Sequence, residues 1–203
     1  MPMRVNLGET VLRINISFAA AVTLTLIVDE SGLCATAFFC CVIHEMGHII
    51  SLMFLGEKPK LIELSFYGVK LERFGASGIK SLGEIIIYAS GPTANFALSA
   101  LLFVFGNTDG TKTAAVVSLC VGLFNLLPCQ PLDGGNILKF FLDRHAEHRK
   151  CEKICFCISC LIIAPMAAAG FILLLKSGNI TLLAVSGYLA AVTYRKEKSM
   201  DFF

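Results

Sequence analysis

Two histidines and a glutamate with the spacing of a metal site stand out in this sequence. They are His44, Glu45 and His48, inside an apolar run from about Leu33 to Leu55. A helix places residues four apart on one face, so both imidazoles can bind one ion while Glu45 lies beside it. This H-E-x-x-H pattern is typical of zinc hydrolases. Two ordinary helix histidines are the weaker interpretation, because ionisable groups are costly inside an apolar span.

A carboxylate that could complete such a site, Asp133, lies within the segment from Asn125 to Gly135. Two prolines and two glycines break the helix there, and broken backbone within a membrane is tolerated where it is buried in protein or lines a wet cavity. Asp133 is the natural third ligand. Two histidines and one aspartate leave a fourth position open, as in catalytic zinc sites, and Glu45 could then act as the general base.

Two asparagines lie near these elements. Asn95 follows Gly91 and Pro92 at a depth comparable to that of His44, and Asn125 precedes the broken segment. Their amides could hold an extended peptide or stabilise an oxyanion. Either could instead bond the backbone that a neighbouring proline leaves unpaired.

The composition describes a membrane protein. Of 203 residues, 56% are hydrophobic and 16% are charged, and the mean hydropathy is +0.74. The net charge of +2, without a basic run carrying aromatics, excludes nucleic acid as a partner. Nine cysteines, an odd number and mostly in apolar segments, argue against a disulfide framework, and we expect Cys129 to be a buried, inert thiol.

The chain that must position these residues is expected to be all-α, with about six transmembrane helices. The predicted spans are 14–28, 33–55, 82–105, 113–127, 154–175 and 180–194. All but two of the 17 Lys and Arg residues, Lys112 and Lys176, fall on one side of this layout. The positive-inside rule therefore places both termini in the cytoplasm, and His44 lies roughly 16 Å from the cytoplasmic end of its span.

The connection between the second and third spans shows partial alternation from Lys60 to Arg73, with Gly68 as a turn. This pattern predicts a short cytoplasmic β-hairpin, and a plain amphipathic connection is the alternative. A hairpin would offer an exposed edge to which an extended substrate could add as a strand.

The motifs together resemble the site-2 protease family of intramembrane zinc metalloproteases. The resemblance rests on His44 to His48, on Gly91-Pro92-x-x-Asn95 and on Asn125 to Gly134, and it covers essentially all predicted spans. It implies a zinc ion bound by His44, His48 and Asp133. It also implies catalysis by Glu45 with support from Asn125, and cleavage of a membrane-embedded or membrane-proximal segment, usually to release a cytosolic domain such as a transcription regulator.

Within that family, the layout is similar to the compact six-span, sporulation-type branch, which implies a bacterial cell membrane. Only about nine residues follow the last predicted span, so we expect the C-terminal nucleotide-sensing domain common in that branch to be missing. We expect one membrane-embedded domain over residues 1–203, with a catalytic core at about 33–135 and supporting helices at 14–28, 154–175 and 180–194.

Two other functions are compatible with the same residues. A six-span metal or solute transporter would need further polar residues along a path to the outer face, and the last two predicted spans offer almost none. An inert membrane scaffold would not need Glu45, which is not expected to bind zinc. The substrate, its cleavage site and the oligomeric state are not indicated by the sequence.

Overall fold

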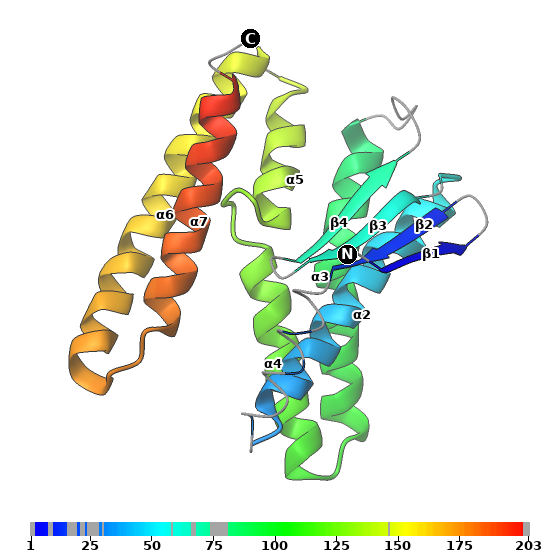
Figure 1. Cartoon of the computed structure of the whole chain (residues 1–203), viewed down its shortest axis with the longest axis vertical. Coiled ribbons are helices and arrows are strands. Elements are labelled where there is room, and N and C mark those ends of the chain that lie inside the picture. The colour runs from blue at the N-terminus through cyan, green and yellow to red at the C-terminus, as the bar shows by residue number, and fades with distance from the viewer. Residues whose placement is uncertain are drawn as a thin grey trace. The chain divides into compact units, whose positions relative to one another are not determined.

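The computed structural model of this chain is mostly helical with one small sheet (Figure 1). It describes residues 3–7, 10–15, 20, 23, 29, 31–57, 59–65, 68–73, 81–145 and 147–200. The chain divides into two compact units, Met1–Leu123 and Phe124–Phe203, and each is described by itself.

A four-stranded sheet belongs to the first unit, in the order β1-β2-β3-β4. Its strands are β1 (Met3–Leu7), β2 (Thr10–Ile14), β3 (Pro59–Ser65) and β4 (Gly68–Arg73). β3 and β4 pair antiparallel, as the predicted hairpin requires, and Gly68 opens β4 opposite Ser65. β1 and β2 form a second antiparallel pair, which we did not predict. β2 and β3 run parallel, which is possible because the long connection containing α2 separates them along the chain.

Three helices complete the first unit: α2 (Leu33–Phe54), α3 (Ser81–Phe105) and α4 (Asp109–Asn125). The carboxylate of Asp29 accepts hydrogen bonds from the backbone N–H groups of Cys34 at 2.7 Å and Ala35 at 3.3 Å. These N–H groups have no partner inside a helix, so Asp29 caps the start of α2.

Close packing of α2 on α3 depends on a glycine. A Cβ built on Gly47 would lie 2.6 Å from the backbone oxygen of Ser90 and 3.0 Å from the Cβ of Ala94. A side chain at this position would therefore push the two helices apart. The pattern of small residues at a helix contact is typical of membrane proteins.

The second unit begins with a turn and contains three helices: α5 (Asp133–Leu142), α6 (His148–Ser177) and α7 (Thr181–Met200). The helices α6 and α7 pack side by side along their length (Figure 1). Two backbone hydrogen bonds of Gln130 hold the turn against α6 and α7. Its N–H donates to Ser159 Oγ at 3.0 Å, and its carbonyl accepts from Thr193 Oγ1 at 2.6 Å. The predicted break between residues 125 and 135 is therefore an ordered turn. No helix was predicted between the spans 113–127 and 154–175, and α5 forms there.

Within the described residues, three helices are long and apolar enough to cross a membrane: Leu33–Phe54, Leu82–Phe105 and Arg149–Ser177. Large apolar side chains on them are exposed, including Phe54 at 88% and Leu161 at 75%, as expected for surfaces that face lipid. The protein is an integral membrane protein. α4 has 17 residues and α7 carries charges near its end, and the predicted span at 14–28 lies mostly outside the described residues. The six-span layout stays a prediction.

Candidate metal centre

Helix α2 buries the face that carries the two histidines. His44 is 5% exposed and His48 is 6% exposed, and Cys40 and Leu52 continue the buried face at intervals of four residues. Met46 on the same turn is 47% exposed. The helix therefore turns polar side chains inward and apolar side chains outward, which is the arrangement expected for a functional site within a membrane.

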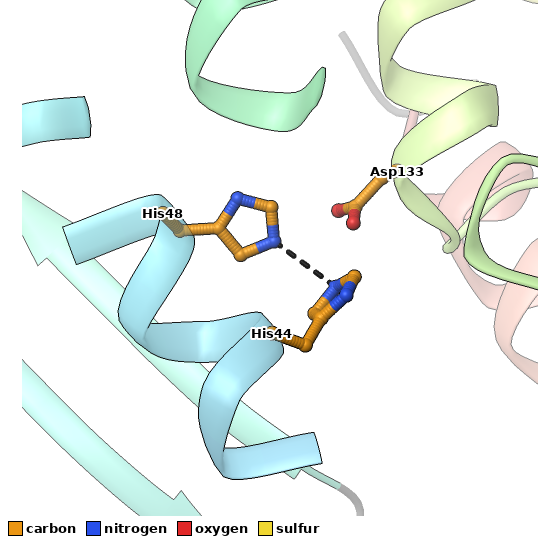
Figure 2. Close-up of side chains that lie close together, drawn as sticks. All are labelled: His44, His48 and Asp133. Atoms are coloured by element: carbon orange, nitrogen blue, oxygen red, sulfur yellow. Dashed lines mark hydrogen bonds between the residues drawn. The ribbon is translucent and has the colours of Figure 1, made fainter. Parts of the chain in front are cut away.

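The two imidazoles face each other through their Nε2 atoms, which lie 3.2 Å apart (Figure 2). Their ring centroids are 4.8 Å apart and their planes meet at 85°. Two nitrogens bound tetrahedrally to one zinc ion, each at roughly 2.0–2.1 Å, would be separated by about 3.3 Å. The observed spacing therefore fits a shared ion, and the histidine pair passes this geometric test.

The orientation of His48 follows from its second nitrogen. His48 Nδ1 lies 2.7 Å from the backbone oxygen of Ile87 on α3. A carbonyl oxygen can only accept a hydrogen bond, so Nδ1 is the donor of this contact and Nε2 is the ring nitrogen left for a metal ion. The carbonyl of Ile87 thus fixes the orientation of the His48 ring. The sequence could not indicate this contact, because every residue has a backbone carbonyl.

Gly91 on α3 leaves the space beside both ligand nitrogens open. A Cβ at this position would lie 2.8 Å from Nε2 of His44 and 2.6 Å from Cε1 of His48, and it would overlap Nε2 of His48 as well. From the sequence, Gly91 stood out only as part of the Gly91-Pro92-x-x-Asn95 segment. The structure shows a more specific reason for glycine, because any side chain would occupy the place where an ion would bind.

Asn95 lies one helical turn beyond Gly91 and is fully buried. Its amide Nδ2 is 3.3 Å from Nδ1 of His44, and its backbone oxygen accepts a hydrogen bond of 2.9 Å from Ser118 Oγ on α4. Asn95, which the sequence placed at a depth comparable to that of His44, therefore lies against the His44 side chain. Its contact is with a histidine, and its complete burial leaves it no surface to offer a peptide.

The remaining predicted site residues are partly exposed. Glu45 follows His44 on α2 and lies at the flank of the buried face, because each helical residue advances about 100°. Asn125 is the last residue of α4, and Asp133 is the first residue of α5 in the second unit. The first unit itself brings together His44, His48 and Asn95.

The turn before Asp133 is compact. A Cβ on Gly135 would lie 2.6 Å from the backbone carbon and oxygen of Cys129, and one on Gly134 would overlap the backbone of Leu126. Both glycines are buried, and Cys129 is 0% exposed. The two glycines thus allow the first turn of α5 to pack on the preceding turn, which holds the carboxylate of Asp133 at the start of a helix.

Comparisons with known proteins agree with these features. A family described as "Peptidase family M50" matches residues 108–166. A zinc metalloprotease of Methanocaldococcus jannaschii is 31% identical over 158 residues, which make up 73% of this chain and 44% of the relative. Stage IV sporulation protein FB of Bacillus subtilis is 24% identical over 148 residues, 64% of this chain and 51% of the relative. The chain thus spans about half the length of these two relatives or less.

A solved structure extends the comparison to the whole fold. The site-2 protease from Methanocaldococcus jannaschii superposes with a TM-score of 0.63 at 23% sequence identity, over 96% of this chain and 94% of that one. At this identity the match establishes the fold alone. Together with the sequence relatives, it shows that this chain carries a peptidase family M50 domain in the fold of the site-2 proteases.

Proposed function

We propose that this chain is an intramembrane zinc metalloendopeptidase. It would hydrolyse a peptide bond in or next to a transmembrane segment of a membrane-tethered protein. The observation that carries the proposal is the buried pair His44 and His48, whose Nε2 atoms face each other at 3.2 Å inside an apolar helix. Relatives named as zinc metalloproteases support the same chemistry.

The proposed zinc ligands are His44, His48 and Asp133. Two imidazole nitrogens and a carboxylate oxygen are donors that zinc takes in catalytic sites, where a fourth position is left open. When bound, the ion would act as a Lewis acid that polarises a peptide carbonyl and lowers the pKa of water towards about 7.

Glu45 is the proposed general base. Glu45 is half-buried, next to the buried His44 on the same helical turn. It would take a proton from the water that attacks the peptide carbon and return it to the nitrogen of the leaving amine as the C–N bond breaks. Asn125, partly exposed at the end of α4, would hold the substrate backbone or donate to the developing oxyanion.

The substrate class follows from the surroundings of the histidines. They lie on a helix long and apolar enough to span a membrane, so a substrate that reaches them is itself membrane-spanning or membrane-associated. A tethered transcription regulator is one candidate. β4 is an edge strand of the sheet, and an extended segment could add to it by backbone hydrogen bonds.

Replacement of the base is the decisive experiment. Wild-type protein and Glu45→Gln would be purified in detergent, loaded with zinc and incubated with a panel of membrane-spanning peptides. We expect the wild type to cut at least one peptide and Glu45→Gln to lose at least about 100-fold in rate. A chelator should stop the wild-type cleavage, and added zinc should restore it. Equal inactivity of both proteins on a broad panel would contradict the proposal, and zinc transport persisting in Glu45→Gln would favour a carrier.

The third ligand needs a separate test. Asp133→Ala should lose most of its bound zinc, as measured by metal analysis after gel filtration. Asp109→Ala is the matched control, because Asp109 is an exposed aspartate that likewise begins a helix. Zinc content in Asp133→Ala equal to that of the control would remove Asp133 from the site.

The orientation in the membrane is also a proposal. We infer six spans with both termini in the cytoplasm of a bacterial cell, from the distribution of Lys and Arg. A C-terminal alkaline phosphatase fusion, which is active only outside the cytoplasm, should be inactive. An active fusion would refute this orientation.

A further inference from the structure

Buried hydroxyl groups on the apolar helices α6 and α7 do more than bond their own helices. Among the residues that the structure describes there, Ser159, Ser186 and Thr193 are buried, at 0%, 1% and 4% exposure. Ser186 Oγ donates to the carbonyl of Leu183, one turn back in the same helix, at 2.9 Å. Ser159 and Thr193 also reach outside their helices, and both bond to Gln130 in the turn before α5.

The two bonds end on the backbone of Gln130, so the direction of each is fixed. Its N–H can only donate, and it lies 3.0 Å from Ser159 Oγ, which in turn donates to the carbonyl of Cys155 at 2.8 Å. Its carbonyl can only accept, from Thr193 Oγ1 at 2.6 Å and from the weaker thiol donor of Cys129 at 3.3 Å. Backbone outside a helix needs such partners within a membrane, and here two helices supply them.

The Gln130 peptide is packed against the start of α5. The N–H of Leu132 donates to the carbonyl of Cys129 at 2.8 Å, which closes the turn around Gln130. In the first turn of α5, a Cβ added to Gly135 would lie 2.7 Å from the backbone nitrogen of Gln130. Asp133 lies between these two contacts. A shift of the Gln130 peptide would therefore move the turn and the start of α5 together.

The other end of α5 is held by an ion pair. Lys139 Nζ lies 2.9 Å from Glu152 Oε1 on α6, and the side chains are only 18% and 12% exposed. This short helix is thus fastened at both ends to the helices that lie beside it (Figure 1). A helix held only at Lys139 could still pivot about that end, so the bonds of Gln130 decide where Asp133 points.

We propose that Ser159 and Thr193 are positioning residues for Asp133. By holding the Gln130 peptide, they fix the start of α5 and present the carboxylate of Asp133 in one orientation. This gives α6 and α7, which carry none of the proposed ligands, a role in the metal site. The inference rests on the proposed function, in which Asp133 binds zinc, and its test uses no substrate.

The first measurement is the zinc dissociation constant, by competition with a chelator. Thr193→Val keeps the volume but removes the hydroxyl, and we expect zinc binding to weaken about 10- to 100-fold, the range for residues that orient a ligand. Thr193→Ser keeps the hydroxyl and should bind zinc like the wild type. Ser186→Ala is the matched control, because it removes a buried hydroxyl of α7 that bonds only within its own helix, and zinc affinity should not change.

Ser159→Ala tests the same peptide from α6 and should weaken zinc binding in the same way. Circular dichroism checks that each variant is folded, and Ser159→Ala decides the question if Thr193→Val does not fold. A folded Thr193→Val or Ser159→Ala variant that binds zinc as tightly as the wild type would overturn the proposal. Weaker binding in Ser186→Ala as well would also overturn it, because any lost hydroxyl would then have the same effect.

The second measurement asks whether Thr193 acts through Asp133. Thr193→Val is combined with Asp133→Ala, and the zinc affinities of both single variants and the double variant are compared. If Thr193 only positions Asp133, its replacement should cause no further loss once the carboxylate is gone. Losses that add in full would overturn the proposal, because they would show that Thr193 acts by another route.

The outcomes separate this inference from the proposed function. Weak zinc binding by Asp133→Ala with unchanged binding by a folded Thr193→Val would overturn the positioning role alone. Unchanged zinc binding by Asp133→Ala would remove Asp133 from the proposed site, and the role of Thr193 and Ser159 with it.

Discussion

Gly91→Ala tests the geometry of the metal centre most directly, because it adds a single methyl group. The added Cβ would lie 2.8 Å from Nε2 of His44, whereas ordinary contact begins at 3.4 Å. His44 or the backbone of α3 must therefore move by at least about 0.6 Å. The added Cβ lies closer still to His48, so the required movement there is larger. Metal–ligand distances in good sites vary by only about 0.2 Å, so the pair can no longer serve one ion without strain.

The expected loss in zinc affinity is at least about 10- to 100-fold, the range seen when the orientation of ligands is disturbed. This corresponds to about 1.4–2.8 kcal/mol of binding free energy. Competition with a chelator measures the affinity, and circular dichroism checks the helix content. Alanine favours a helix over glycine by about 1 kcal/mol, so loss of helix would not account for weaker binding.

Two further glycines make the interpretation specific. Gly187→Ala is the control, because a Cβ at Gly187 in α7 has no atom within 4 Å, and zinc affinity should not change. Gly47→Ala separates α2 from α3 without entering the space between the imidazoles, so it should lower thermal stability more than Gly91→Ala does. Zinc binding by Gly91→Ala that equals wild type would refute the reasoning.

Two other predictions concern residues outside the metal centre. Asp29→Ala should lower the thermal unfolding midpoint, because it removes the cap of α2. The pKa of Asp29 is lowered in the folded protein, mainly by the hydrogen bond from Ser31 Oγ. The stabilisation is therefore full above the pKa of the unfolded state and is lost as the pH falls through the lower pKa of the folded state. Melting curves should therefore show the difference from wild type at neutral pH and lose it in acid, and a constant difference would contradict the role of the charge. Alkylation of the folded protein by iodoacetamide should modify the exposed Cys34 and spare Cys129, which is 0% exposed, and mass spectrometry of peptides would detect the opposite result.

Several parts of the site could be predicted because they depend on local periodicity. His44 and His48 share a face in any helix, and the apolar run around them made α2 the expected span. The alternation from Lys60 to Arg73 predicted the antiparallel pairing of β3 with β4. The prolines before Asp133 and the glycines after it predicted a break in the helix.

Other parts depended on which segments pack together, and no local pattern contains that information. The pairing of β2 with β3 joins residues about 50 positions apart, and it extends the predicted hairpin into a four-stranded sheet. The helix α5 was missed because its ten residues follow a proline-rich turn and are too short for a clear apolar period.

The sequence alone determined the two histidines, their common face and the apolar helix that carries them, because helical spacing and hydropathy are properties of neighbouring residues. Only the tertiary structure decided how those histidines are held. Three groups on α3 lie within a few ångströms of the histidines on α2: the carbonyl of Ile87, the Cα of Gly91, which carries no side chain, and the amide of Asn95. Such distances follow from the packing of two helices, which is decided by the whole interface and not by any one motif.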